Sequence, residues 1–199
     1  MKKKTLFLDI GGVLLTNGWD TRSREKAAQV FALDFNELNK RHALTFDTYE
    51  IGKLTLEEYI QRTVFYQPRS FSLEQYKAFM FEQSQPFTDM LELMKDLKKK
   101  KKLQIAALSN EGRELIEHRI EKFKLKEFVD FFVVSSFIHL RKPDLDIYKL
   151  ALDLAQVKPE QAVYIDDREM LAEIGGSLGM HAIQHQSYEK TKELLEVLL

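Results

Sequence analysis

The stretch Thr-Leu-Phe-Leu-Asp-Ile-Gly-Gly-Val at residues 5–13 is a short apolar run that ends in an aspartate and two glycines. A run of this length, with lysines before it and a turn signal after it, is typical of a buried β-strand. Glycines directly after a strand let the backbone pass close to a bound group because they carry no Cβ. We therefore predict a strand over residues 5–9, with the Asp9 carboxylate at its carboxyl end.

Further along the chain, three similar apolar runs and one less apolar run are predicted strands. Segments with helical periodicity separate them, and this alternation is typical of parallel strands joined by crossover helices. The predicted strands cover residues 104–109, 131–135, 162–166 and 181–184. The predicted helices between them cover residues 89–101, 112–123, 146–155 and 168–178. The pattern indicates an α/β fold with a parallel sheet flanked by helices.

Residues 17–85 interrupt this alternation, because they contain several helix-like segments and no convincing strand. The helix-like segments cover residues 21–32, 35–45, 55–64 and 72–82. Two of them begin with the spacing of a capping box, namely Thr55 with Glu58 and Ser72 with Gln75. We therefore predict a core domain of residues 1–16 and 86–199, with an all-helical cap domain of residues 17–85 inserted after the first strand.

The composition suits a globular chain with no general affinity for polyanions. Of the 199 residues, 44% are hydrophobic, which is enough for a buried core and a modest inserted domain. Thirty Lys and Arg residues nearly balance 31 Asp and Glu residues, so neither nucleic acid nor an anionic membrane is an expected partner. Asp9 interrupts the N-terminal apolar run and no run is long enough to span a bilayer, so we expect a cytoplasmic protein.

Polar residues lie at or just after the ends of several predicted strands. These residues are Asp9, Ser109, Asn110, Lys142, Asp166 and Asp167. Because active sites of open α/β sheets lie at the carboxyl ends of the strands, we expect these side chains to share one site. The chain has no cysteine, which excludes thiolate zinc sites and thiol nucleophiles, so any metal must use oxygen or imidazole ligands.

This set of side chains has a chemical logic around a phosphoryl group. Mg²⁺ prefers oxygen ligands and usually binds through one or two carboxylates, which Asp9, Asp166 and Asp167 can supply. Ser109 and Lys142, with the neighbouring backbone amides, would neutralise the phosphoryl oxygens. The Asp9 carboxylate could then attack phosphorus and form an aspartyl-phosphate that water hydrolyses.

Four ordered stretches of the chain make it similar to the haloacid dehalogenase superfamily. The stretches are Asp9-Ile10-Gly11-Gly12-Val13, Ser109-Asn110, Lys142-Pro143 and Asp166-Asp167. The resemblance implies a Rossmann-like sheet with a helical cap and a branch similar to bacterial glucose-1-phosphate phosphatases. It also implies that Asp9 is the nucleophile, that the Gly11 carbonyl and Asp167 bind Mg²⁺, and that Asp166 acts directly or through water.

Position 11 departs from the family pattern. Phosphatases of the superfamily commonly carry there a second aspartate that protonates the leaving oxygen, whereas this chain has Gly11. Such a proton donor is worth about two to four orders of magnitude in rate. Three explanations stay open: a substrate with a good leaving group, a proton supplied by another group or by water, or a protein that binds without fast turnover.

The interpretation that fits these observations is a Mg²⁺-dependent phosphoric monoester hydrolase that acts on a small phosphorylated metabolite, as a monomer or homodimer. The predicted catalytic residues are Asp9, Ser109 and Lys142; the predicted substrate-binding residues are Gly11, Gly12, Ser109, Asn110 and Lys142; the predicted metal ligands are Asp9, Gly11, Asp166 and Asp167. A 2-haloacid dehalogenase is a second hypothesis, although the adjacent acidic pair would repel an anionic substrate. A non-catalytic binder of phosphorylated ligands is a third.

Overall fold

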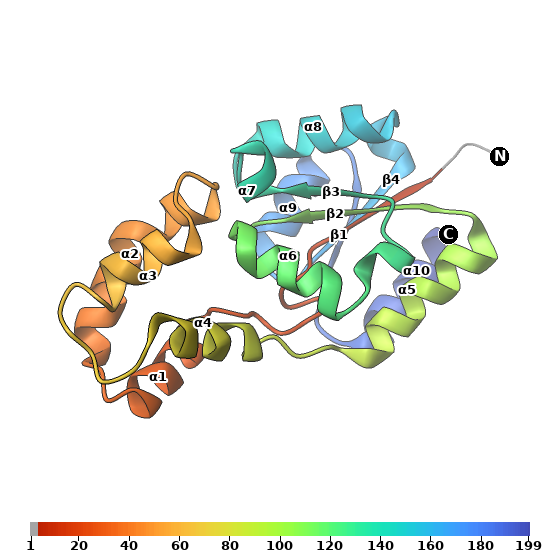
Figure 1. Cartoon of the computed structure of the whole chain (residues 1–199). Helices are drawn as coiled ribbons and strands as arrows, with labels where there is room; N and C mark the ends of the chain where they lie inside the picture. Colours follow the sequence, from red (N-terminus) through yellow and green to blue (C-terminus); the bar gives the residue numbers. More distant parts are fainter. Residues whose placement is uncertain (1–3) are drawn as a thin grey trace.

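The computed structural model describes residues 4–199 and contains a five-stranded parallel sheet with helices on both faces (Figure 1). The strands are β1 (Thr5–Leu8), β2 (Gln104–Ser109), β3 (Phe131–Val134), β4 (Ala162–Asp166) and β5 (His181–Gln184). They lie in the order β3-β2-β1-β4-β5, so the first strand occupies the middle of the sheet. The predicted α/β fold with a parallel sheet is confirmed, and the less apolar run is its fifth strand.

The two faces of the sheet are covered by different helices because successive side chains of a strand point to opposite faces. Leu6 and Leu8 of β1 belong to the apolar cluster that includes residues of α5, α6 and α10, whereas Phe7 belongs to a cluster with α8. The core helices are α5 (Thr88–Lys101), α6 (Arg113–Lys122), α7 (Ser135–Ile138), α8 (Leu145–Ala155), α9 (Glu169–Ser177) and α10 (Tyr188–Leu198). Short 3₁₀ turns lie at Leu125–Glu127 and Pro159–Gln161.

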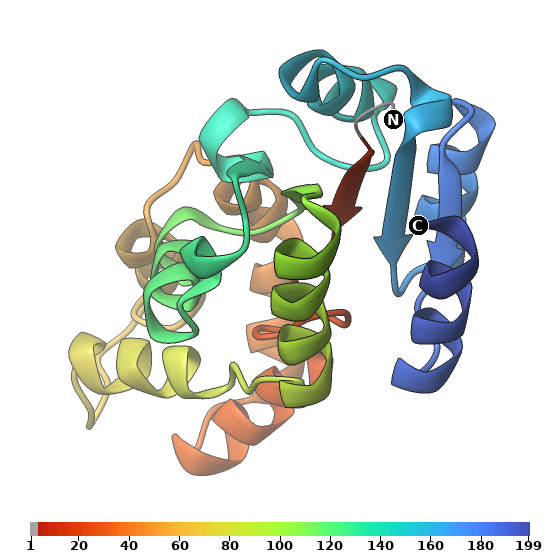
Figure 2. The ribbon, with the colours of Figure 1, turned by 90° about the vertical axis from the view of Figure 1, so that its right-hand side faces the viewer.

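The inserted segment is all-helical, as predicted, and stands apart from the sheet (Figures 1 and 2). Its helices are α1 (Thr21–Val30), α2 (Phe35–Glu50), α3 (Leu56–Thr63) and α4 (Leu73–Glu82). Both predicted capping boxes form, at the starts of α3 and α4. The cap has an apolar cluster rich in aromatic rings, to which the core helix α6 contributes Leu115. This packing supports the proposed division into a core of residues 1–16 and 86–199 and a cap of residues 17–85. Residues 1–3 of the proposed core lie outside the described part of the chain.

Two chain segments join the cap to the core, and they are bound to each other. The Thr16 amide donates to the Gln85 carbonyl at 2.8 Å, and the Thr16 hydroxyl donates to the Gln83 carbonyl at 3.0 Å. The buried Arg119 guanidinium of α6 donates to the Ser84 hydroxyl at 2.9 Å and to the Thr16 carbonyl at 3.2 Å. Arg119 therefore holds both linkers against the core.

The Tyr59 hydroxyl connects α3 to two other parts of the cap. It accepts a hydrogen bond from Trp19 Nε1 at 2.9 Å and lies 2.8 Å from His42 Nδ1. Because the indole can only donate, the Tyr59 hydroxyl can donate its own hydrogen bond to His42 Nδ1. That nitrogen accepts a hydrogen bond only when the imidazole is neutral. Burial, assisted by the Arg24 charge, lowers the pKa of His42 to about 4.

Protonation of His42 should therefore destabilise the fold in mildly acidic solution. An unfolded histidine has a pKa of about 6.5, so the unfolded chain binds more protons between that value and about pH 4, and stability is lost as the pH falls through this window. We expect the melting temperature to fall more between pH 7 and pH 4.5 in the parent protein than in His42→Asn. Thermal melts at both pH values check this, and equal slopes for the two proteins would contradict it.

Candidate active site

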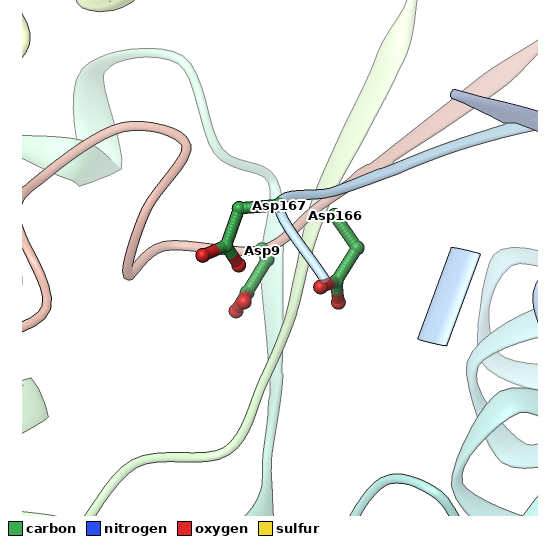
Figure 3. A group of neighbouring side chains, drawn as sticks. All are labelled: Asp9, Asp166 and Asp167. Atoms are coloured by element: carbon green, nitrogen blue, oxygen red, sulfur yellow. The ribbon is translucent and has the colours of Figure 1, made fainter. Parts of the chain in front are cut away.

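Three carboxylates from two neighbouring strand ends meet at the carboxyl edge of the sheet (Figure 3). Leu8 of β1 lies opposite Ile165 of β4, so the residues that follow them, Asp9 and Asp166, are side by side. Asp167 comes next in the chain. Each of the three carboxylates has an oxygen within 4.8 Å of the others. The structure thus brings together the acidic residues that the sequence placed at different strand ends.

The Asp9 carboxylate is buried and anchored through one oxygen. Its Oδ1 accepts hydrogen bonds from the Ile10 amide at 2.8 Å and from the Ser109 hydroxyl at 2.5 Å, and Lys142 Nζ lies 3.3 Å away. Burial raises the pKa of Asp9, and Lys142 opposes this shift. Within residues 4–199 no hydrogen bond goes to Oδ2. That oxygen is therefore the one available to a bound ion or to an electrophile.

Asp166 is fully buried, and both of its carboxylate oxygens accept hydrogen bonds from the protein. Its Oδ2 accepts from Lys142 Nζ at 2.6 Å and from the Tyr164 hydroxyl, and its Oδ1 accepts from the Arg168 amide at 2.9 Å. Burial lowers the pKa of Lys142, but Asp9 and Asp166 raise it, and the net direction is upward. Lys142 is therefore a charged ammonium held between two carboxylates, and Asp166 fixes its position.

Asp167 differs from Asp166 because it is only partly buried and has an unsatisfied oxygen. Its buried Oδ1 has no hydrogen-bond partner in the described chain. Burial, followed by the Asp166 charge, raises the pKa of Asp167. Gly12 makes room for this side chain: its φ is +76°, and a Cβ there would lie 2.3 Å from the Asp167 Cγ. A carboxylate with one unpaired oxygen beside Asp9 is suited to hold a divalent cation, which prefers carboxylate oxygens.

Asn110 lines the same small hollow as Asp9 and Lys142 and also fixes the Lys142 backbone. Its side-chain amide donates to the Lys142 carbonyl and accepts from the Lys142 amide, both at 2.8 Å. This reciprocal pair fixes the loop that carries Lys142 against the end of β2. The Asn110 side chain thus positions the lysine, and its contact with a phosphoryl group stays a prediction.

Arg141, the other cation next to Lys142 in sequence, points to the cap. Its guanidinium forms ion pairs with Asp47 at 2.6 Å and with Glu50 at 2.7 Å, both on α2. Because α2 runs to Glu50, beyond the helix end predicted at residue 45, its last turn reaches the core. The Ser135 hydroxyl also donates to the Glu50 carbonyl at 2.7 Å. Lys142 is therefore the cation of the carboxylate cluster, and Arg141 joins core and cap.

Glu111 and Arg119 are site residues that the sequence reasoning missed. Glu111 follows Asn110 directly and its carboxylate is hydrogen-bonded to Arg119 Nη1. Burial, opposed by Arg119, raises the pKa of Glu111 to about 7. A small hollow beside the carboxylate cluster is lined by Asp9, Gly11, Asn17, Ser109, Asn110, Glu111, Lys142, Arg168 and Leu171. The polar run after β2 was the one signal that could have pointed to Glu111.

A parallel sheet with a helical cap and a carboxylate cluster at its carboxyl edge defines the class of capped Rossmann-like hydrolases. The family model described as haloacid dehalogenase-like hydrolase matches residues 24–184. The chain belongs to this family. The predicted membership of the superfamily is thereby confirmed.

Relatives with known names agree with this assignment. A phosphorylated carbohydrates phosphatase of Thermotoga maritima is 30% identical over 135 residues, which are 63% of this chain and 62% of that protein. Haloacid dehalogenase-like hydrolase domain-containing protein 3 of Xenopus laevis is 38% identical over 65 residues, which are 33% of this chain and 26% of that protein. The chain thus spans less than two thirds of the length of either of these curated relatives.

Solved structures share the fold at lower identity. One is a haloacid dehalogenase family enzyme of Bacteroides thetaiotaomicron in complex with magnesium and inorganic phosphate, which is 22% identical with a TM-score of 0.78. The alignment covers 92% of this chain and 94% of that enzyme's chain. An L-2-haloacid dehalogenase of Xanthobacter autotrophicus is 14% identical with a TM-score of 0.64 and covers 98% of this chain and 83% of that one. Among residues 4–199, no helix has the length and apolarity needed to cross a membrane.

Proposed function

We propose that the protein is a Mg²⁺-dependent phosphatase that acts on a small phosphorylated metabolite through an aspartyl-phosphate at Asp9. The observation that carries this proposal is the arrangement around Asp9. Its Oδ1 is held by Ser109 and faces the Lys142 ammonium, while Asp167, whose Oδ1 has no hydrogen-bond partner in the described chain, belongs to the same cluster. A nucleophile, a cation for phosphoryl oxygens and an acidic metal site are thus adjacent.

The magnesium ligands that fit best are Asp9 and Asp167, with the Gly11 carbonyl as a third donor. Asp166 already satisfies both oxygens with protein donors, so we assign it the support of Lys142 rather than a direct bond to the ion. When bound, Mg²⁺ would polarise the phosphoryl oxygens and neutralise part of their charge. The Bacteroides enzyme that shares the fold was crystallised with magnesium and phosphate, which supports this choice of ion.

Residues of the chain itself carry out the phosphoryl transfer. Ser109 and the Ile10 amide hold Asp9 Oδ1, which orients Oδ2 as the attacking atom. Lys142 balances the charge on the phosphoryl oxygens as the bond to the leaving group breaks. Water then attacks the aspartyl-phosphate at phosphorus, which returns the Asp9 carboxylate and releases inorganic phosphate.

A phosphorylated sugar is the substrate class that we favour. The Thermotoga relative is named for phosphorylated carbohydrates, and the cap would enclose a small substrate rather than a protein segment. The dehalogenase hypothesis is less favoured, because three clustered carboxylates would repel a haloacid carboxylate and a departing halide. We propose action in the cytoplasm, as a monomer or homodimer.

Phosphate release from a panel of substrates tests the proposed function. The panel contains sugar 1-phosphates, sugar 6-phosphates, nucleotides and acyl phosphates, each assayed with Mg²⁺ and with a chelator. We expect turnover of at least one sugar phosphate that stops when the metal is removed. Halide release from 2-haloacids without metal would instead favour a dehalogenase. Ligand-induced stabilisation without any turnover would favour a non-catalytic binder.

Substitution of Gly12 should damage the metal site without replacing a carboxylate. In Gly12→Ala the new Cβ would overlap Asp167. The alanine would also have to adopt a φ of +76°, which L residues rarely occupy. We expect Mg²⁺ affinity, measured by calorimetry, to fall about 10- to 100-fold, as for other displaced supports of metal ligands. Gly176→Ala is the matched control, because a Cβ there makes only an ordinary contact of 3.5 Å. Equal Mg²⁺ affinity in both variants would contradict the assignment of Asp167.

A further inference from the structure

The space beside Gly11 is occupied by side chains from other parts of the chain. A Cβ at Gly11 would lie 2.8 Å from Asn17 Oδ1, 3.6 Å from Glu111 Oε1 and 3.8 Å from Arg119 Nη1. In an aspartate at this position, the carboxylate carbon would be bonded directly to that Cβ. The Glu111 carboxylate therefore lies close to the place where a side-chain carboxylate of residue 11 would be.

Glu111 is held there by contacts on its backbone and on its carboxylate. The Glu111 amide donates to the Ser135 hydroxyl at 2.9 Å, and Arg119 binds Oε1. Arg119 is itself fixed by Ser84 and Thr16. Within residues 4–199 no hydrogen bond goes to Oε2, so one carboxyl oxygen remains for a proton. Glu111 also lines the same small hollow as Asp9 and Lys142.

The other polar neighbours cannot easily give up a proton. Asn17 directs an acceptor oxygen toward Gly11, and an amide does not transfer protons. The Arg119 guanidinium stays charged at all ordinary pH values. Lys142 is held as an ammonium between Asp9 and Asp166. Glu50, the buried carboxyl from the cap, does not line the hollow that contains Asp9, whereas Glu111 does, which leaves Glu111 as the group placed to act.

We propose that the Glu111 carboxyl donates the proton to the leaving oxygen, in place of a side chain at position 11. This inference rests on the proposed phosphatase function. Asp9 Oδ2 forms a bond to phosphorus while the bond from phosphorus to the leaving oxygen breaks. The leaving oxygen keeps that electron pair and takes the Glu111 proton, so the products are an alcohol, an aspartyl-phosphate and a Glu111 carboxylate.

The second half of the reaction restores Glu111. A water molecule attacks the phosphorus of the aspartyl-phosphate and gives one proton to the Glu111 carboxylate. The bond between phosphorus and Asp9 breaks, the Asp9 carboxylate keeps the electron pair, and inorganic phosphate leaves. The site returns to its starting protonation with no other reactant. The ion pair with Arg119 would hold the Glu111 carboxylate in place between the two half-reactions.

The dependence of the rate on the leaving group tests this proposal. p-Nitrophenyl phosphate releases a stable anion that needs no proton, whereas glycerol 2-phosphate releases an alkoxide that does. We expect Glu111→Gln to lower kcat/KM for glycerol 2-phosphate about 10²- to 10³-fold and to change kcat/KM for p-nitrophenyl phosphate less than about threefold. Glu117→Gln, an exposed change on α6, is the control and should change neither.

A rescue variant strengthens the test. Gly11→Asp in the Glu111→Gln background introduces a carboxyl at position 11, where the tightest contact of the new Cβ is with Asn17 Oδ1 at 2.8 Å. We expect it to recover at least about tenfold in kcat/KM for glycerol 2-phosphate. Gln keeps an acceptor for Arg119, so the single variant should fold; if circular dichroism shows that it does not, Glu111→Asp takes its place in the same comparison.

The outcomes separate this proposal from the proposed function. Equal losses for both substrates would show that Glu111 only supports the structure, and no loss for either would show that it is idle; both results overturn the proton-donor role while the phosphatase function stands. If the parent protein releases phosphate from neither substrate with Mg²⁺ and from no member of the wider panel, the phosphatase function fails, and the proton-donor role fails with it.

Discussion

Asp9→Asn is expected to lower kcat by about 10³-fold or more on any phosphate ester that the parent protein hydrolyses. The amide has nearly the shape of the carboxylate, but it is a poor nucleophile and a weak ligand for Mg²⁺. Burial raises the pKa of Asp9 against the opposing Lys142 charge, and the Asp166 and Asp167 charges add to the rise. The neutral side chain should therefore fold as stably as the parent. Steady-state phosphate release and a thermal melt of the same sample check both parts.

The control for this variant is Asp153→Asn, an exposed change on α8 that should leave kcat unchanged. A loss of activity in Asp9→Asn that is matched by a loss of folded protein would not support a chemical role for Asp9. Retained activity of more than about one tenth of the parent value would contradict the nucleophile assignment outright.

Lys142→Met is expected to destabilise the fold by about 3–5 kcal/mol at neutral pH, since it leaves buried carboxylates without their cation. Lys142 Nζ lies 2.6 Å from Asp166 and 3.3 Å from Asp9, and its side chain is almost completely buried. Methionine fills a similar volume, so the lost charge rather than a cavity dominates the effect. Urea unfolding followed by circular dichroism measures the change in the free energy of unfolding.

Lys100→Met provides the matched comparison, because Lys100 pairs with Asp96 at 2.9 Å on the surface of α5. An exposed pair of this kind contributes little to the free energy of unfolding, because solvent and salt screen it. If the two substitutions cost the same, Lys142 is not the charge that compensates the buried acids. The double variant Lys142→Met/Asp166→Asn should be more stable than Lys142→Met alone, because it also removes the uncompensated Asp166 charge.

The core fold and the position of the acidic cluster could be predicted from sequence because they depend on local patterns. Each buried strand is a short apolar run, and in a parallel sheet the residues that end the runs meet at one edge. Asp9, Ser109 and Asp166 followed from that rule alone. The capping boxes at Thr55 and Ser72 were readable for the same reason, since they use neighbours three residues apart.

The contacts that depend on packing could not be read in the same way. Arg119 looks like any charged residue of an amphipathic helix, yet the fold buries it under both linkers. Glu111 becomes part of the site only because Arg119 holds it beside Gly11. The reciprocal bonds between Asn110 and the Lys142 backbone likewise join residues far apart in sequence. Sequence spacing carries no signal for such pairs.

The end of α2 was misplaced for a related reason. Residues 45–53 contain aromatic and polar side chains around a glycine, which is compatible with a connection between helices. In the structure the helix continues to Glu50, because its last turn contacts the core through Asp47, Glu50 and Arg141. Gly52, with a φ of +74°, then turns the chain close to the Ser136 carbonyl.

Covalent attachment of a phosphoryl group to Asp9 is the step on which all the proposed residue roles depend. The protein is mixed with its best phosphorylated substrate and Mg²⁺, quenched in acid, and treated with borohydride, which reduces an aspartyl-phosphate to homoserine. Peptide mass spectrometry then locates the change. We predict homoserine at position 9 in samples that contain both substrate and Mg²⁺. Hydrolysis of substrate with an unmodified Asp9 under every quench condition would contradict the account.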